Sequence, residues 1–321
     1  MKTNPRAYFA LLFVCLVWGT TYMALRIGVE GFPPLIFAGI RQFTAAILLF
    51  LLVYFWRKKT WFSWEVFRSQ MLPGFLLITV GNGLVSWAEQ FIPSGLASVI
   101  CASMPVFVVL LNLAVPTSTR PNIWVWAGLI LGLIGIFLLF RDSMEFTGTK
   151  YFLEGMIATI LATISWAIGS IIVKHRKNVA DPMWNAACQL FWGGVFLLIG
   201  SLIFEDWQNL PMITNASLIA LVYLILFGSL GAYSAFTYAL THLPVGLVSI
   251  YAYVNPVVAV LLGFLFLNET VNSWTILALS LTITGIFLIN LGYKRATASR
   301  LAKAKASEVI EAREYSLSED I

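Results

Sequence analysis

Residues 92–105 read IPSGLASVICASMP, and residues 243–256 read LPVGLVSIYAYVNP. The two segments share a proline, a glycine, a leucine, a serine and a closing proline in the same order, so that Pro105 recurs 151 positions later as Pro256. Apolar helices of similar composition can match by chance. Prolines and glycines that match at one constant offset instead favour an internal duplication of the chain.

Further matches extend this duplication. The tetrapeptide GIFL at 135–138 returns at 285–288, and Trp124 returns as Trp274, each 150 positions later. A repeat of this length covers nearly the whole chain. The predicted parts are a first repeat at 1–140, a second repeat at 151–292 and a polar tail at 293–321.

The composition indicates that the repeats lie within a membrane. Of the 321 residues, 60% are apolar and 11% are charged, whereas soluble domains average about 45–50% apolar and about 25% charged. A chain so poor in charge could not cover a water-facing surface. The net charge of +5 does not indicate nucleic-acid binding, because Lys and Arg gather in short loops and in the tail with almost no aromatic residues between them.

Ten apolar segments are long enough to cross a bilayer, since a spanning helix needs about 20 residues. Their connections are short, which predicts that neighbouring helices pack antiparallel. The sequence thus predicts an all-α integral membrane protein with ten transmembrane helices. The predicted spans are 7–28, 33–56, 71–90, 95–115, 122–140, 151–174, 182–204, 217–240, 246–267 and 273–292.

The number of spans in each repeat determines how the repeats are related. Five is an odd number, so the second repeat must enter the bilayer from the opposite face. The two five-helix repeats are therefore predicted to be inverted, related by a two-fold axis in the membrane plane. Inverted repeats suit transport by alternating access, because the two halves can exchange conformations to give two arrangements of equal energy.

Charged loop residues orient the spans, because cytoplasmic loops carry an excess of Lys and Arg. The side that holds both termini carries Lys2, Arg6, Arg57, Lys58, Lys59, Arg68, Arg120, Lys174, Arg176 and Lys177. The opposite side carries mostly acids, which include Glu89, Glu205, Asp206 and Glu269. Both termini are therefore predicted to be cytoplasmic.

Three short motifs add a family resemblance: WGTTY at 18–22, AGIRQF at 38–43 and LNET at 267–270. With the duplicated proline-ending segments, they make the chain similar to the EamA-type family of the drug/metabolite transporter superfamily. The resemblance implies a ten-span exporter in a bacterial inner membrane, with a cavity lined by spans one, three, four, six, eight and nine. The chain departs from the family at 115–121, where VPTSTRP lacks the usual acid, which argues against a symmetric role for Glu269.

Polar and aromatic side chains recur at helical spacing on the spans that would line such a cavity. Aromatic walls with sparse amides and hydroxyls suit a partly apolar organic solute. The alternatives are lipid-facing packing for the aromatic residues and interhelical hydrogen bonds for the asparagines. The predicted substrate-binding residues are Trp18, Tyr22, Asn82, Trp87, Met104, Trp166, Tyr233, Tyr238, Tyr251 and Asn255.

Three further positions combine backbone and charge effects. Pro105 and Pro256 are predicted to break their helices and to free carbonyl groups near the midplane. Arg41 lies about eight residues into its span, roughly 12 Å along the axis, too deep to reach the surface comfortably. It could attract an anionic substrate group. The favoured alternative is an Arg that binds carbonyls at a broken helix end, since the second span is not implied to line the cavity.

Small residues on the fifth span predict close packing. Gly128, Gly132 and Gly135 share one helical face, as in small-residue contacts between membrane helices. Packing against the tenth span is favoured over dimerisation through this face. Whether the protein is a monomer or a homodimer is left open.

Several other classes of function lack the residues that they need. No Asp or Glu lies deep in a span, and Glu89 comes closest, so coupling to protons is left open. Cys15, Cys101 and Cys188 are isolated in apolar runs and the two histidines lie apart, which predicts no metal, disulfide or cofactor. A membrane enzyme would need paired catalytic groups at mid-depth, and a sensor or scaffold would need a larger soluble domain.

The expected function is therefore transport. The favoured hypothesis is export of small organic metabolites by alternating access, and facilitative uptake or exchange is the alternative. Amino acids, amines, nucleobases and drug-like compounds all fit an aromatic pocket. The expected partners are such a solute and the lipid bilayer.

Overall fold

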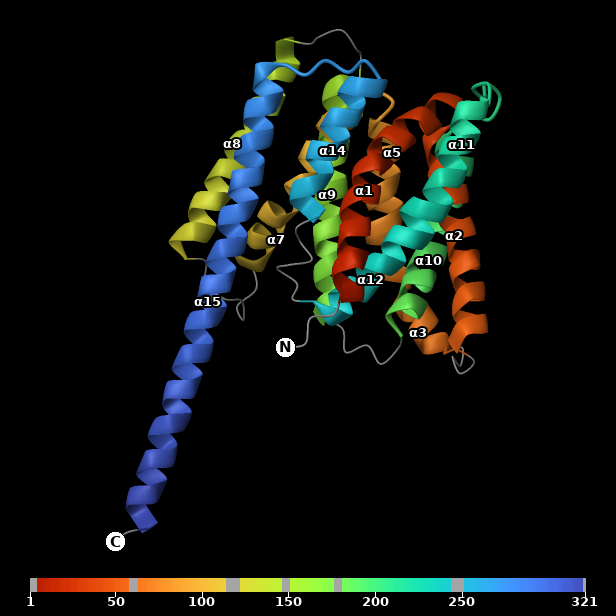
Figure 1. Cartoon of the computed structure of the whole chain (residues 1–321). Coiled ribbons are helices and arrows are strands. Elements are labelled where there is room, and N and C mark those ends of the chain that lie inside the picture. Colours follow the sequence, from red (N-terminus) through yellow and green to blue (C-terminus); the bar gives the residue numbers. More distant parts are fainter. Residues whose placement is uncertain are drawn as a thin grey trace.

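The computed structural model describes residues 5–57, 63–113, 122–145, 151–175, 181–243 and 251–319 of the chain. All regular structure within these ranges is helical (Figure 1). Among the described residues, eight helices are long and apolar enough to cross a membrane, and two shorter apolar helices cover Ile123–Gly135 and Val254–Phe266. The prediction of an all-helical chain with many membrane spans is confirmed.

The described part of the first half forms nine helical elements. They are α1 (Pro5–Gly31), α2 (Pro34–Arg57), α3 (Trp64–Ser69), α4 (Met71–Gly74), η1 (Phe75–Asn82), α5 (Gly83–Ala88), α6 (Ser94–Ala102), α7 (Met104–Leu113) and α8 (Ile123–Glu145). The second half forms α9 (Phe152–His175), α10 (Pro182–Phe204), α11 (Asn215–Tyr223), η2 (Leu224–Gly231), α12 (Ala232–His242), α14 (Tyr251–Phe266) and α15 (Ser273–Glu319).

Two of the predicted spans contain π-helical segments. The span predicted at 71–90 runs through α4, η1 and α5, and the span predicted at 217–240 runs through α11, η2 and α12. In both η1 and η2 the backbone hydrogen bonds join residues five positions apart, whereas those of an α-helix join residues four apart. Such segments occur often at functional sites. Each lies near the middle of its span.

The two predicted helix breaks differ. The span predicted at 95–115 is interrupted at Ser103, directly before the turn that holds Pro105. The predicted break at Pro256 is wrong, because α14 continues through that residue from Tyr251 to Phe266. A proline ring fixes φ near the helical value and removes only one donor, and membrane helices tolerate this where neighbouring groups bind the freed carbonyl.

Local sequence accounts for several helix starts. The carboxylate of Asp181 accepts a hydrogen bond from the backbone N–H of Met183 at 2.8 Å, and Pro182 occupies the first turn of α10. Thr214 and Ser217 form a reciprocal capping box at the start of α11. Both arrangements satisfy backbone donors that a helix leaves free in its first turn.

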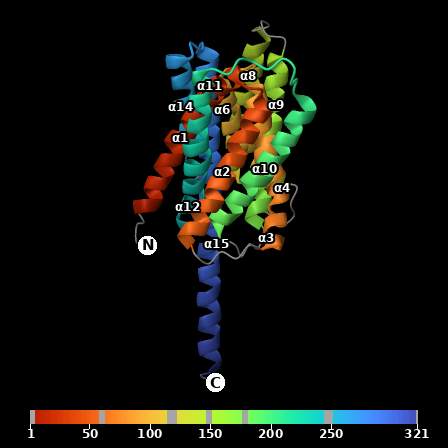
Figure 2. The same cartoon turned by 90° about the vertical axis from the view of Figure 1, so that its right-hand side faces the viewer.

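Helices from the two halves pack in pairs. α2 packs along α10, which Figure 2 shows at the front of the bundle, and α8 packs along α15 at one edge (Figure 1). The second pair meets glycine to glycine, since a Cβ added at Gly128 or at Gly285 would lie within 2.8 Å of a backbone nitrogen of the other helix. The predicted packing of the fifth span against the tenth is confirmed.

α15 does not end with the tenth predicted span at residue 292. It continues as one helix to Glu319 and projects beyond the bundle (Figure 1). α1 begins and α15 ends on the same side of the bundle in both views (Figures 1 and 2).

Candidate functional site

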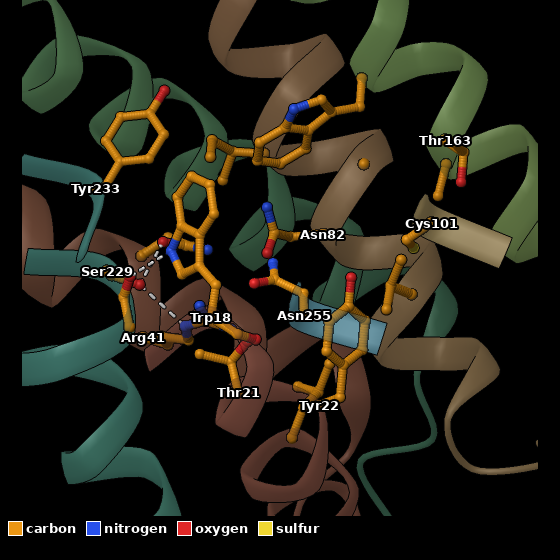
Figure 3. Close-up of a pocket in the computed structure, with 18 of the residues that line it drawn as sticks. Trp18, Thr21, Tyr22, Arg41, Asn82, Cys101, Thr163, Ser229, Tyr233 and Asn255 are labelled. Atoms are coloured by element: carbon orange, nitrogen blue, oxygen red, sulfur yellow. Dashed lines mark hydrogen bonds between the residues drawn. The ribbon is translucent and has the colours of Figure 1, made fainter. Parts of the chain in front are cut away.

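A cavity of about 150 Å³ lies inside the bundle, and residues of both halves line it. We call it the central cavity. Eight of the ten predicted substrate-binding residues line it, together with Arg41 (Figure 3). The eight residues are Trp18, Tyr22, Asn82, Met104, Trp166, Tyr233, Tyr251 and Asn255.

The π-helical segments supply part of the cavity wall. In η1, the carbonyl of Leu76 accepts a hydrogen bond from the Ser165 hydroxyl at 2.8 Å, and the carbonyl of Leu77 accepts one from the Asn82 amide at 3.3 Å. In η2, the carbonyl of Gly228 accepts one from the Trp18 indole at 3.3 Å. Side chains from neighbouring turns thus bind carbonyls of the unusual backbone, as a membrane interior requires.

Arg41 belongs to a buried polar cluster at one end of the cavity. Its Nε donates to the hydroxyl of Ser229 at 2.9 Å, and that hydroxyl donates to Oε1 of Gln42 at 2.9 Å. All three side chains are buried, and Arg41 is 6% exposed. The favoured sequence interpretation, an Arg bound to carbonyls at a broken helix end, is not what the structure shows. Arg41 binds a hydroxyl group of η2 instead.

Aromatic rings form another part of the wall. Trp18 packs edge-on against Tyr251, with ring centroids 5.1 Å apart. Trp166 lies against Gly81, where an added Cβ would come within 2.9 Å of the indole ring. The hydroxyl of Tyr233 donates to Gln189 at 2.6 Å. These contacts hold the rings in place in this conformation.

The two asparagines differ in their bonding. The amide nitrogen of Asn255 is oriented to donate to the carbonyls of Cys15 and Tyr251, at 3.0 Å each. Asn255 therefore links α14 to α1, which matches the interhelical alternative. Asn82 donates only within its own helix, and its amide oxygen accepts no hydrogen bond from the described residues. Asn82 is the better candidate for contact with a solute.

Two predicted site residues lie elsewhere. Trp87 packs with the apolar cluster around Ala88 and against the ring of Phe91. Tyr238 packs beside α1 and against His242, with ring centroids 4.2 Å apart. Each follows by five residues a residue of its own span that lines the cavity, Asn82 or Tyr233. At 3.6 residues per turn, five residues place a side chain about 140° round the helix, on another face.

Other lining residues were not singled out from the sequence. They come partly from α2 and α10, which corrects the expectation that only spans one, three, four, six, eight and nine line the cavity. The long side chain of Arg41 reaches the cavity from α2, and Gln42 follows it. The polar lining residues that the sequence analysis did not predict are Thr21, Gln42, Cys101, Thr163 and Ser229.

Three glutamates lie at the ends of helices. Glu269 accepts hydrogen bonds at the start of α6 from the Ser94 backbone and hydroxyl, at 2.7 and 2.8 Å, and from the Gly95 backbone at 3.1 Å. Glu205 accepts two backbone bonds at the start of α2. Each carboxylate thus connects the second half to the first at a helix N-terminus, where negative charge is stabilised.

The third glutamate, Glu89, is fully buried, and neither oxygen of its carboxyl has a hydrogen-bond partner among the described residues. Arg26 donates to its backbone carbonyl rather than to its side chain. Glu89 does not line the central cavity.

A helical bundle with membrane-length apolar helices around a cavity lined by aromatic and polar side chains is the architecture of a polytopic membrane protein. Comparison with known proteins agrees with this class. The model of the EamA-like transporter family matches residues 5–141 and again residues 153–291. The chain therefore belongs to the EamA-like transporter family.

Named relatives point to the same role. The inner membrane transporter YedA of Escherichia coli (strain K12) is 38% identical over 287 residues, which are 88% of this chain and 90% of YedA. The transporter YoaV of Bacillus subtilis (strain 168) is 28% identical over 296 residues, which are 90% of this chain and 98% of YoaV. The chain is thus a multi-pass inner membrane transporter.

One protein of known crystal structure superposes on the model with a TM-score of 0.64. The match covers 90% of this chain and 98% of that protein, at 16% sequence identity. At this identity the likeness concerns the fold alone.

Proposed function

We propose that the protein exports a small organic solute from the cytoplasm by alternating access, and that the central cavity is the solute site. The observation that carries this proposal is the cavity itself. It is lined by side chains of both halves, and the π-helical segments η1 and η2 both border it. Solute sites at the interface of two repeats, beside irregular helix segments, are typical of transporters.

The proposed architecture is ten transmembrane helices in two inverted repeats. The two segments matched by the family model support a duplication. So do η1 and η2, each of eight residues, which begin 149 positions apart at Phe75 and Leu224. The two shorter apolar helices, in α8 and α14, lie where the fifth and ninth spans are predicted.

Packing between the halves supports the same symmetry. α1 packs against α11, α12 and α14, while α9 packs against η1, α5, α6 and α7. The first span thus contacts the eighth and ninth spans, and the sixth span contacts the third and fourth. These contacts are equivalent under a symmetry that exchanges the two halves. In such an arrangement, rocking one half against the other would open the cavity first to one side and then to the other.

The proposed orientation places both termini in the cytoplasm. The Lys and Arg residues of the loops favour this side, and α1 begins on the same side of the bundle as α15 ends (Figure 1). The starts of α2 and α6, which Glu205 and Glu269 cap, would then face the periplasm.

Facilitative uptake or exchange is the second candidate. The cavity lining contains no Asp or Glu that could carry a coupling proton. A carrier without coupling would equilibrate its solute in either direction.

Efflux measurements test the proposal. A strain that overproduces the protein is compared with an empty-vector strain, and extracellular metabolites are quantified by mass spectrometry. At least one small organic solute is expected to accumulate outside the overproducing cells, and Trp18→Leu should abolish that accumulation. The matched control is Trp126→Leu, since Trp126 is 42% exposed on the outside of the bundle. Equal efflux by wild type and Trp18→Leu would refute the assigned site.

A further inference from the structure

We infer that the solute carries a carboxylate group, which binds the guanidinium of Arg41 in the central cavity. This inference rests on the proposed function and narrows it to small organic acids, including amino acids. It sets aside amines, nucleobases and drug-like cations that carry no acid.

Arg41 has more hydrogen-bond donors than the described residues around it use. Its Nε is satisfied by Ser229. The Ser229 hydroxyl gives its own proton to Gln42, so its orientation is set and its free electron pair faces Arg41. The two Nη groups of Arg41 form no hydrogen bond with the described residues. A guanidinium has five N–H donors in a planar fork, and four of these remain available.

The buried positive charge of Arg41 also favours an anionic solute. Arg41 is buried and forms no ion pair within the described parts of the chain. Of the residues that the structure describes, no Asp or Glu lines the cavity. An isolated buried charge is strongly unfavourable unless it is paired. Glu89 interacts electrostatically with Arg41, but it lies outside the cavity wall. An anion within the cavity would supply a hydrogen-bonded partner, which the Glu89 carboxyl does not.

The shape and the single charge of the Arg41 guanidinium distinguish among anions. A carboxylate matches the fork of an Arg with two parallel hydrogen bonds. A phosphate monoester carries about −1.5 to −2 charges at neutral pH. The cavity lining offers Arg41 and no Lys or second Arg. One guanidinium balances a single negative charge, which favours a carboxylate.

The volume and the wall of the central cavity indicate what the rest of the solute is like. The cavity of about 150 Å³ is close to the volume that holds one benzene molecule in an engineered protein interior. Trp18, Tyr22 and Trp166 supply apolar ring faces. The free amide oxygen of Asn82 can accept a hydrogen bond from a second polar group such as an amine. A body of about one aromatic ring or one branched chain fits this wall.

Binding measurements on the purified full-length protein in nanodiscs test the inference. Benzoate, benzamide and benzylamine have the same ring and differ in charge, and phenyl phosphate and phenylalanine extend the set. Benzoate or phenylalanine is expected to bind, and benzamide and benzylamine should bind at least about 10-fold more weakly. Arg41→Gln should weaken carboxylate binding about 10- to 100-fold, the usual effect of losing hydrogen bonds to a charged group.

Two further variants are measured, so that the inference can still be tested if Arg41→Gln fails to fold. Arg41→Lys keeps the charge but loses the planar fork, and it should bind carboxylates with intermediate affinity. Arg68→Gln, at an exposed position of α3, should bind like wild type. Carboxylate binding that is unchanged in Arg41→Gln or Arg41→Lys would overturn the inference.

The probes also separate this inference from the proposed function. Tighter binding of phenyl phosphate than of benzoate, or of benzylamine than of benzoate, would overturn the carboxylate assignment. So would the absence of binding by every carboxylate in the set. If cells instead export a solute without an acid group, and Trp18→Leu abolishes that export, then transport through the cavity stands and the carboxylate inference fails.

Discussion

Replacing Glu269 with glutamine tests how the two halves are held together at the end of the bundle opposite the termini. The carboxylate accepts three hydrogen bonds at the start of α6, from the Ser94 backbone at 2.7 Å, the Ser94 hydroxyl at 2.8 Å and the Gly95 backbone at 3.1 Å. Gln keeps one oxygen acceptor and turns the other into a donor. At least one of these three bonds must therefore be lost.

The expected loss follows from the contacts. A hydrogen bond to a charged group contributes about 1.5–3 kcal/mol, and a negative charge at a helix N-terminus adds about 0.3–1 kcal/mol. Glu269 is partly exposed, so solvent screening lowers both terms. We expect Glu269→Gln to reduce the free energy of unfolding by about 2 kcal/mol.

Unfolding of the purified protein in detergent, followed by intrinsic Trp fluorescence, measures this loss. The control is Glu30→Gln, since Glu30 is exposed at the end of α1. It should leave the unfolding midpoint unchanged. If Glu269→Gln unfolds within about 0.5 kcal/mol of wild type, the usual spread for surface substitutions, the carboxylate does not stabilise α6 as argued.

Three further predictions concern the solute, the packing and the orientation. Asn82→Leu should reduce transport by at least about 10-fold without loss of membrane expression, whereas Asn255→Leu should lower stability; the reverse pattern in efflux and melting assays would exchange their roles. Gly128→Val should destabilise the α8–α15 contact by about 1–3 kcal/mol, because a Cβ there would lie 2.8 Å from the backbone nitrogen of Ile289; a variant that melts like wild type would contradict this packing. Fluorescent-protein and alkaline-phosphatase fusions after Ile321 should be bright and inactive, respectively; phosphatase activity with a dark fluorophore would reverse the orientation.

The length of the apolar segments predicts the helical membrane fold from sequence, because a chain segment that crosses a bilayer must satisfy its own backbone hydrogen bonds. The internal repeat predicts that the fold has two related halves. The repeat also points to the cavity. Asn82 and Tyr233 lie 151 positions apart on the third and eighth spans, which match across the repeat, and both line it. Trp18 and Trp166, on the first and sixth spans, line it as well.

The π-helical segments could not be predicted from the sequence, because no residue type marks them. Trp87 and Tyr238 pack outside the cavity because each lies about 140° round its helix from the lining residue five positions earlier, Asn82 or Tyr233. Arg41 was misjudged for another reason. Its backbone lies on a helix that the family resemblance does not assign to the cavity, and only the structure shows how far its side chain reaches. Pairings across the bundle, such as Glu269 with α6, likewise depend on tertiary packing.

The central claim is that the cavity opens in turn to the two sides of the membrane. Cys101 is a native reporter, because its side chain lines the cavity and is partly exposed. In a Cys15→Ala and Cys188→Ala background, a membrane-impermeant maleimide is added to spheroplasts from outside and to inverted vesicles from inside. The account predicts that Cys101 is labelled from both sides and that the exported solute slows labelling. Labelling from one side alone, or labelling from neither side, would contradict alternating access through the central cavity.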